Sequence, residues 1–212
     1  MTRSTLAVLS ALSLFGCHYV DGGPEVSQAR TVEAFTRLQV EDGIPATLSP
    51  GSPQATVNAP QKVVEKLETV VKNGTLIVRL KSGVIVTSME GTEVVITGTG
   101  VVAVEASGAS SLSVSGVDVS PFRATASGAS QLTVSGKTAD ARLAASGAST
   151  LSAGQLIAEV ASVEASGAST VEVNASKAIE GTASGASHVT VSGGADSTKI
   201  TTSGGSSVNA AN

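Results

Sequence analysis

The amino-acid sequence predicts an all-β protein: a right-handed parallel β-helix (solenoid) with about 20 residues per coil and a less regular, β-rich N-terminal cap. A repeated tetrapeptide, alternating apolar residues on both sides of it and a scarcity of large side chains lead to this prediction. The tetrapeptide is Ser-Gly-Ala-Ser, with Ser-Gly-Gly-Ser as its last copy. The copies begin at Ser107, Ser127, Ser146, Ser166, Ser184 and Ser203. A fixed step of this length is typical of folds in which each repeat covers its neighbour's apolar face.

Apolar and polar residues alternate around every copy. After the first copy, one polar residue separates Leu112 from Val114, and before it one polar residue separates Val104 from Ala106. A period of two predicts strands with one buried and one exposed face. The corresponding inward pairs after the later copies are Leu132/Val134, Leu151/Ala153, Val171/Val173, Val189/Val191 and Val208/Ala210.

The glycine of each tetrapeptide is expected to form the corner of a coil. Glycine adopts positive φ without a Cβ clash, and the alanine after it fits a narrow corner. The serines can bond to backbone at the bend or to the next coil. Stacked coils lie about 4.8 Å apart, and crossovers between parallel strands are right-handed. The expected corner glycines are Gly108, Gly128, Gly147, Gly167 and Gly185.

Residues 31–212 are expected to form a single β-helical domain, with irregular coils and a cap over 31–100 and regular repeats over 101–212. An end cap is needed because an uncovered coil exposes a bare sheet edge. Asn73-Gly74 between two alternating runs predicts a hairpin, and residues 60–67 predict a short helix. Strands in the cap are expected at 35–40, 44–48, 55–58, 69–72, 75–80 and 93–97.

The N-terminus predicts an exported lipoprotein. Residues 1–17 join Arg3 to a short apolar stretch and then to Leu14-Phe15-Gly16-Cys17. The stretch is too short to span a bilayer, and its end resembles the lipobox of bacterial lipoproteins. Cys17 is the only cysteine, so lipid attachment explains it most simply. An ordinary secretory signal with a stray thiol is the alternative.

Residues 18–30 are expected to be a flexible tether between the lipid and the domain. His18 stands where an Asp often marks retention in the inner membrane, so we expect the outer membrane, on its periplasmic or its surface face. The net charge of −4 and the absence of a basic stripe with interleaved aromatics exclude nucleic acid as a partner.

The start and the repeats of the chain resemble a known family. Arg30-Thr31-Val32, Leu38-Gln39-Val40 and the run from Val70 to Val78 carry the resemblance, together with the Ser-Gly-Ala-Ser ladder followed by Leu-x-Val. The chain is similar in these features, over about residues 30–210, to the head GIN domain family of auto-transporter adhesins. The resemblance implies a β-helical exported module of the bacterial envelope and brings no functional residues with it.

Catalysis, a cofactor and a metal site are not expected. His188 is the only histidine after residue 18, and its position predicts a solvated face. No second histidine is available for a metal or a Ser-His-Asp set. Serines recur in every coil, which favours a structural role for them.

Charged residues recur at fixed places in the repeats and predict a shallow surface stripe. Acidic residues fall after each corner and basic residues shortly before the next one. The stripe suggests either a groove for a charged glycan or plain solvation with weak ion pairs. The candidate residues are Asp118, Arg123, Asp140 and Arg142.

Three functions follow from these observations. The first is a non-catalytic, adhesin-like binding module on a membrane-anchored lipoprotein, with a glycan or a surface protein as its partner. The second is a structural scaffold, a homo-oligomer that assembles through stacked coils. The third and weakest is a glycan-active β-helical enzyme.

Overall fold

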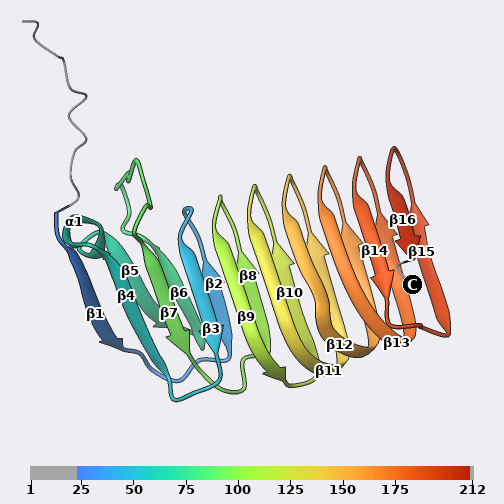
Figure 1. Ribbon diagram of the computed structural model, residues 1–212, viewed down its shortest axis with the longest axis horizontal. Coiled ribbons are helices and arrows are strands. Elements are labelled where there is room, and N and C mark those ends of the chain that lie inside the picture. The colour runs from blue at the N-terminus through green and yellow to red at the C-terminus, as the bar shows by residue number, and fades with distance from the viewer. Residues whose placement is uncertain (1–22, 211–212) are drawn as a thin grey trace, which may run out of the picture.

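The computed structural model describes residues 23–210, which form one sheet of 16 strands wound into a β-solenoid (Figure 1). Successive coils are about 20 residues apart, so the predicted all-β solenoid and its period are confirmed. The regular strands are β8 (Ala103–Ala106), β9 (Ser111–Asp118), β10 (Phe122–Ala126), β11 (Gln131–Ala145), β12 (Thr150–Ala165), β13 (Thr170–Ala183), β14 (His188–Ser192), β15 (Ser197–Thr202) and β16 (Ser207–Ala210).

Each coil crosses two faces of the rod. The β10 face consists of β8, β10, the C-terminal halves of β11, β12 and β13, and β15, all paired in parallel. The β9 face consists of β9, the N-terminal halves of the same long strands, β14 and β16. In Figure 1 the tetrapeptide corners are the sharp turns along the top of the rod, and the long strands bend at the opposite edge.

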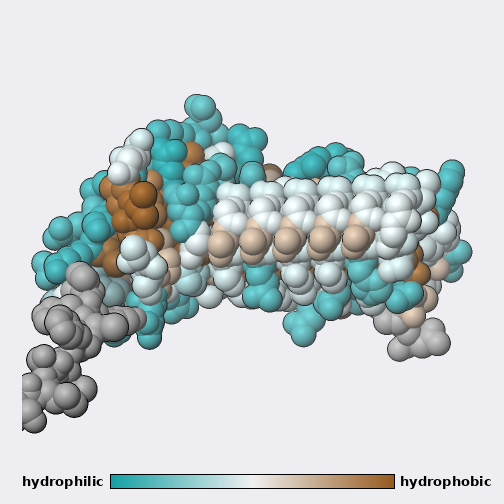
Figure 2. Space-filling model, turned by 90° about the horizontal axis from the view of Figure 1, so that it is seen from above, coloured by the Kyte–Doolittle hydropathy of each residue, from teal (hydrophilic) through white to brown (hydrophobic). Residues whose placement is uncertain are grey.

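The corner glycines lie directly on top of one another. From the second copy onward, the backbone N–H of the corner alanine donates to the carbonyl of the glycine one coil earlier, at 2.8 Å from Ala129 to Gly108 and 2.7 Å from Ala168 to Gly147. A Cβ added to Gly147 would lie 2.6 Å from the carbonyl oxygen of Gly128. Figure 2 looks onto this edge and shows the corners as a straight row of small residues. These glycines form the corners of the coils at positive φ, as predicted, and their missing Cβ lets neighbouring coils approach closely.

The last serine of each tetrapeptide joins neighbouring coils, and in the first five copies it is buried. Its hydroxyl donates to a backbone carbonyl of the coil before it, as from Ser130 to Ala106 at 3.0 Å and from Ser149 to Ala126 at 3.1 Å. These bonds satisfy a polar group that would be costly to bury without a partner. The same bond recurs at Ser110, Ser169, Ser187 and Ser206.

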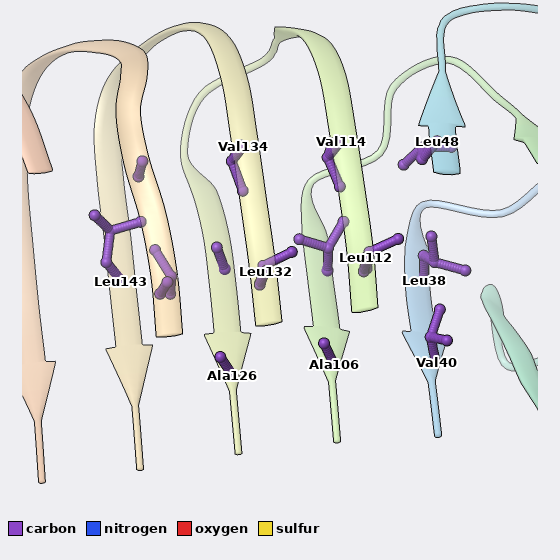
Figure 3. Close-up of a cluster of buried hydrophobic side chains, with 14 of the residues drawn as sticks. Leu38, Val40, Leu48, Ala106, Leu112, Val114, Ala126, Leu132, Val134 and Leu143 are labelled. Carbon is purple, nitrogen blue, oxygen red and sulfur yellow. The ribbon is translucent and has the colours of Figure 1, made fainter. Parts of the chain in front are cut away.

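The core is a narrow seam of Leu, Val and Ala between the two faces (Figure 3). Leu112 and Leu132 project from the β9 face toward Ala106 and Ala126 of the β10 face. All four are at most 1% exposed. Alanine on one face leaves room for leucine from the other, so the scarcity of large side chains suits the short distance between the faces.

The N-terminal part contributes coils out of chain order. Residues 37–49 form a coil that lies against β8 and β9, and residues 75–97 form a coil on its far side. Antiparallel strands and one short helix complete the cap. These elements are β1 (Glu25–Thr31), β2 (Arg37–Val40), β3 (Pro45–Ser49), β4 (Gln54–Pro60), α1 (Gln61–Val64), β5 (Leu67–Lys72), β6 (Thr75–Leu80) and β7 (Glu93–Thr97).

Most elements expected in this region are present, including the hairpin at Asn73-Gly74 between β5 and β6. The prediction of a flexible tether over 18–30 is wrong for residues 25–30, because these belong to β1, which pairs antiparallel with β4. β1 is an edge strand whose side chains are mostly exposed, so it lacks the apolar alternation that reveals a half-buried strand. Residues 18–22 and Cys17 lie outside the described part of the chain.

A substitution pair tests whether close backbone approach at the corners stabilises the fold. Gly147 and Gly43 both turn a coil at nearly the same φ, +76° and +75°, but only Gly147 has a neighbour within 4 Å of an added Cβ. Gly43→Ala should therefore cost about 1–2 kcal/mol from positive φ alone, and Gly147→Ala about 3 kcal/mol or more. Urea denaturation followed by circular dichroism measures both. Equal losses in the two variants would contradict the stacking argument.

Candidate functional site

The outward-facing positions of the β10 face carry a row of charged and polar side chains. Arg123 of β10 is paired in register with Arg142 of β11, Arg142 with Ser162 of β12, and Ser162 with Glu180 of β13. Adjacent strands are about 4.8 Å apart, so three steps carry the row across about 14 Å of surface. These four positions are basic at Arg123 and Arg142 and acidic at Glu180, and Lys199 of β15 follows Glu180 in register.

A groove of about 400 Å³ follows this row. Ser162 lies between the basic and acidic ends, and Glu164 adds a second carboxylate near Glu180. Such a groove offers guanidinium donors at one end and carboxylate acceptors at the other. Its lining residues are Arg123, Asp140, Arg142, Leu143, Ala144, Val160, Ser162, Glu164 and Glu180.

Asp140 and Arg142 are held together at the edge of the groove. Nη2 of Arg142 lies 3.2 Å from Oδ2 of Asp140, and both side chains stay open to solvent, at 51% and 34% exposure. The backbone N–H of Asp140 donates to the hydroxyl of Ser120 at 3.1 Å. This bond ties β11 to the preceding coil. The ion pair thus restricts the Arg142 guanidinium, and both side chains line the groove.

Arg123 has no such partner. Its guanidinium forms no hydrogen bond or ion pair with any residue of the described chain, 23–210. Like charges on directly opposed strand positions repel and destabilise a sheet, and only one of this pair is balanced by Asp140. The two arginines therefore form a site of unbalanced positive charge that an anion can occupy between them.

A second hollow, of about 340 Å³, lies on the N-terminal side of Arg123. Arg37, Arg123 and Arg142 border it, and Val102 and Pro121 supply an apolar part of its lining. Val102 is 39% exposed although most valines of the rod are buried. Arginines beside an exposed apolar patch suit a ligand that combines anionic groups with apolar surface.

The predicted stripe is only partly one site. Arg123, Asp140 and Arg142 come together as expected, but Asp118 lies apart from them and pairs with Lys137 at 3.4 Å. Asp118 and Lys137 line a separate hollow of about 410 Å³ near the bend of the long strands. Asp118 ends β9, before the chain crosses to the β10 face, whereas Asp140 comes after the bend in β11 and lies on that face. Their similar distance from the preceding corner does not reveal this difference.

Two lining residues of the groove were not among the predicted site residues. Glu164 and Ser162 stand on the outward side of β12, at alternate positions of one strand. The alternation before each tetrapeptide predicts their outward position, because the residues between the inward positions must face outward. Aligning these outward positions from copy to copy would have found both.

Other candidate residues lie outside the groove. His188 is on the β9 face, where Nδ1 is 2.7 Å from the hydroxyl of Ser207. Among residues 23–210, no three His, Cys, Asp or Glu side chains gather closely enough to hold a metal ion. In the same part of the chain, no helix is long and apolar enough to cross a membrane.

Comparison with known proteins identifies relatives of the whole solenoid. Residues 34–195 match the family described as "Putative auto-transporter adhesin, head GIN domain". No curated protein matches the chain.

Solved structures share the fold at low sequence identity. A putative adhesin from Bacteroides fragilis is 14% identical with a TM-score of 0.71, over 89% of this chain and 97% of its own. A putative lipid binding protein from Parabacteroides distasonis is 13% identical with a TM-score of 0.53, over 90% and 98%. A putative adhesin from Parabacteroides merdae is 12% identical with a TM-score of 0.51, over 90% and 97%. These likenesses establish the fold.

A conservative substitution separates a structural from a binding role for the ion pair. Because the side chains of Asp140 and Arg142 are both solvent-exposed, Asp140→Asn should change the free energy of unfolding by less than about 1 kcal/mol. Thermal and urea unfolding of the variant measure the change. A loss above about 2 kcal/mol would mean that the pair holds the coils together and that the groove is a by-product of stability.

Proposed function

Because the chain belongs to the putative auto-transporter adhesin family with the head GIN domain, we propose that it is a non-catalytic binding module of the cell envelope. The ligand is an acidic surface polysaccharide, and the groove on the β10 face binds it. The lipid on Cys17 holds the module at the outer membrane.

The observation that carries this proposal is the pair of arginines on neighbouring strands. Arg123 and Arg142 are in register, and Arg123 forms no ion pair within residues 23–210. A carboxylate between them would accept hydrogen bonds from both guanidinium groups, and such charge-assisted bonds are stronger than neutral ones.

The acidic end of the groove suits a carbohydrate better than a simple anion. Glu164 and Glu180 are acceptors for hydroxyl groups, and Ser162 can both donate and accept. A polymer of acidic sugars carries carboxylates and hydroxyls in alternation. The chain of a polyuronate laid across the strands would therefore meet donors and acceptors in turn.

The anchor rests on the sequence. Cys17 follows a short apolar stretch in a lipobox-like setting and is the only cysteine of the chain. Several acyl chains on one residue add about 0.8 kcal/mol of membrane affinity per buried CH₂.

A scaffold is the second candidate, and the last coil favours it. Val208 is paired in register with the fully buried Val189, yet it stays partly exposed, since among residues 23–210 no further coil lies over it. Within the described residues, β15 pairs with β13 and β16 with β14, and the other side of each strand is uncovered. Such an edge can pair with another chain. Concentration-dependent filaments of a protein lacking residues 1–17 would support the scaffold.

Removing the arginines tests the binding proposal. Arg123→Ala and Arg142→Ala should each weaken polygalacturonate binding by about 10-fold to 100-fold, which corresponds to the loss of a charge-assisted hydrogen bond. Lys137→Ala removes the same charge outside the groove, where Lys137 pairs with Asp118, and should leave binding unchanged. Calorimetry at two salt concentrations measures the affinities.

Three results would contradict this proposal. Equal weakening by Lys137→Ala would reduce the interaction to net charge. Absence of binding to any acidic polysaccharide would remove the ligand class. Depolymerisation of a polyuronate that is lost in Asp140→Asn would show that the protein is an enzyme.

The anchor is tested by fractionation of cells that express the full chain. The protein should sediment with the outer membrane, and Cys17→Ala should move it to the soluble periplasmic fraction. Mass spectrometry of the mature N-terminus should find acyl chains on Cys17. A protein with an unmodified Cys17 that is found in the medium would support the plain secretory signal instead.

A further inference from the structure

We propose that the loop between β6 and β7, residues 81–92, is a membrane-contacting tip that seats the N-terminal end of the rod on the bilayer. The occupant of this apolar surface is the lipid bilayer that receives the acyl chains of Cys17, so the inference rests on the proposed lipid anchor. We call residues 84–89 the apolar tip.

The apolar tip exposes one large hydrophobic side chain, with three partly buried ones beside it. Ile85 is 85% exposed, the highest value among the exposed large hydrophobic residues in the described chain, and Val84, Val86 and Met89 beside it are only partly buried. Figure 2 shows a hydrophobic patch at the N-terminal end of the rod, on the edge where the tetrapeptide corners are pale. A patch of this kind on a soluble domain is typical of an interaction site.

This loop departs from every other corner on its edge. The repeats turn with four small residues, whereas the corner between β6 and β7 takes residues 81–92 and rises above its neighbours in Figure 1. Its ends are closed by its own backbone, from the N–H of Val84 to the carbonyl of Lys81 at 3.1 Å and from Thr92 to Met89 at 3.0 Å. The loop is therefore closed on itself. Val86 and Met89 pack against the core and hold it in place, while Ile85 points outward.

The C-terminal end of this loop lies beside the first described residues. Gly91 is close to the start of β1, since a Cβ added there would lie 3.0 Å from Oε1 of Glu25 and 3.9 Å from Cδ of Pro60. The N–H of Gln61 donates to the carbonyl of Pro24 at 3.0 Å, which fixes the first described residues at the same end of the rod.

The length of the preceding segment brings the bilayer to this end. Cys17 is six positions before Gly23, and a chain of that length spans at most about 20 Å. Acyl chains on Cys17 thus hold the membrane surface close to β1 and to the loop packed against it. An exposed isoleucine at that place gains by insertion into the acyl boundary, as apolar side chains of interfacial segments do.

A tryptophan reporter tests the tip, because the chain contains no Trp. The full lipidated chain with Ile85→Trp is reconstituted in phosphatidylcholine vesicles, with and without brominated acyl chains. We expect Trp emission at position 85 to shift to shorter wavelength and to be quenched at least two-fold by the brominated lipid. Ile157→Trp is the matched control, because Ile157 is also strongly exposed, at 63%, but lies in β12. It should keep solvent-like emission without quenching.

The outcomes separate the tip from the anchor. Vesicle-bound protein in which position 85 gives solvent-like, unquenched emission overturns the tip and leaves the anchor in place. Equal quenching at positions 85 and 157 also overturns it, since the rod would then lie flat. Protein with intact Cys17 that stays unbound overturns the anchor, and the tip with it, because no bilayer is then within reach. Both substitutions are at exposed positions, so neither threatens the fold.

Discussion

The close approach of backbone to backbone at the corners is the constraint on which the rest of this structure depends. From the second copy onward, the corner alanine donates to the glycine carbonyl one coil earlier at 2.7–2.8 Å, and the space between the stacked glycines admits no Cβ. Coils that meet so closely at one edge cannot slip, because a shift of one residue would put a side chain where only hydrogen fits. The last serine of the tetrapeptide, two positions after the glycine, joins the same two coils through a second hydrogen bond. The corners therefore set the register for both faces of the rod.

Fixed register is what gives the outer surface its chemistry. Once the corners align, Arg123, Arg142, Ser162 and Glu180 follow one another across four strands, although about 20 residues separate each from the next. A repeat protein of this kind can change its ligand by changing outward positions, while inward Leu, Val and Ala keep the core. The N-terminal end follows the same rule. The lengthened corner at residues 81–92 carries the apolar tip, while β6 and β7 stay paired with β2 and β3.

Local sequence patterns were enough to predict the solenoid. They did not predict the order in which distant segments stack in the N-terminal part. The tetrapeptide step and the alternation around it contain the corners, the coil length and the inward residues, because each depends on neighbours in the chain. The insertion of residues 37–49 between the coil of 75–97 and the first regular coil depends on contacts between distant segments. β1 was missed because an exposed edge strand carries no alternation. In the groove, Arg123, Asp140 and Arg142 were predicted together, and Asp118 was misplaced because the bend between the faces varies in length.

Engineered disulfides test the stacked corners most directly. In a chain with Cys17→Ala, the pair Ala129→Cys and Ala148→Cys would be one strand spacing apart, about 4.8 Å, within the Cα separation that a disulfide spans. The pair Ala129→Cys and Ala168→Cys would be two spacings apart, beyond that range. Mild oxidation followed by thiol counting should show rapid bridging of the first pair within single molecules and none of the second. Equal bridging of both pairs, or of neither, would contradict the register from which the groove and the tip derive their positions.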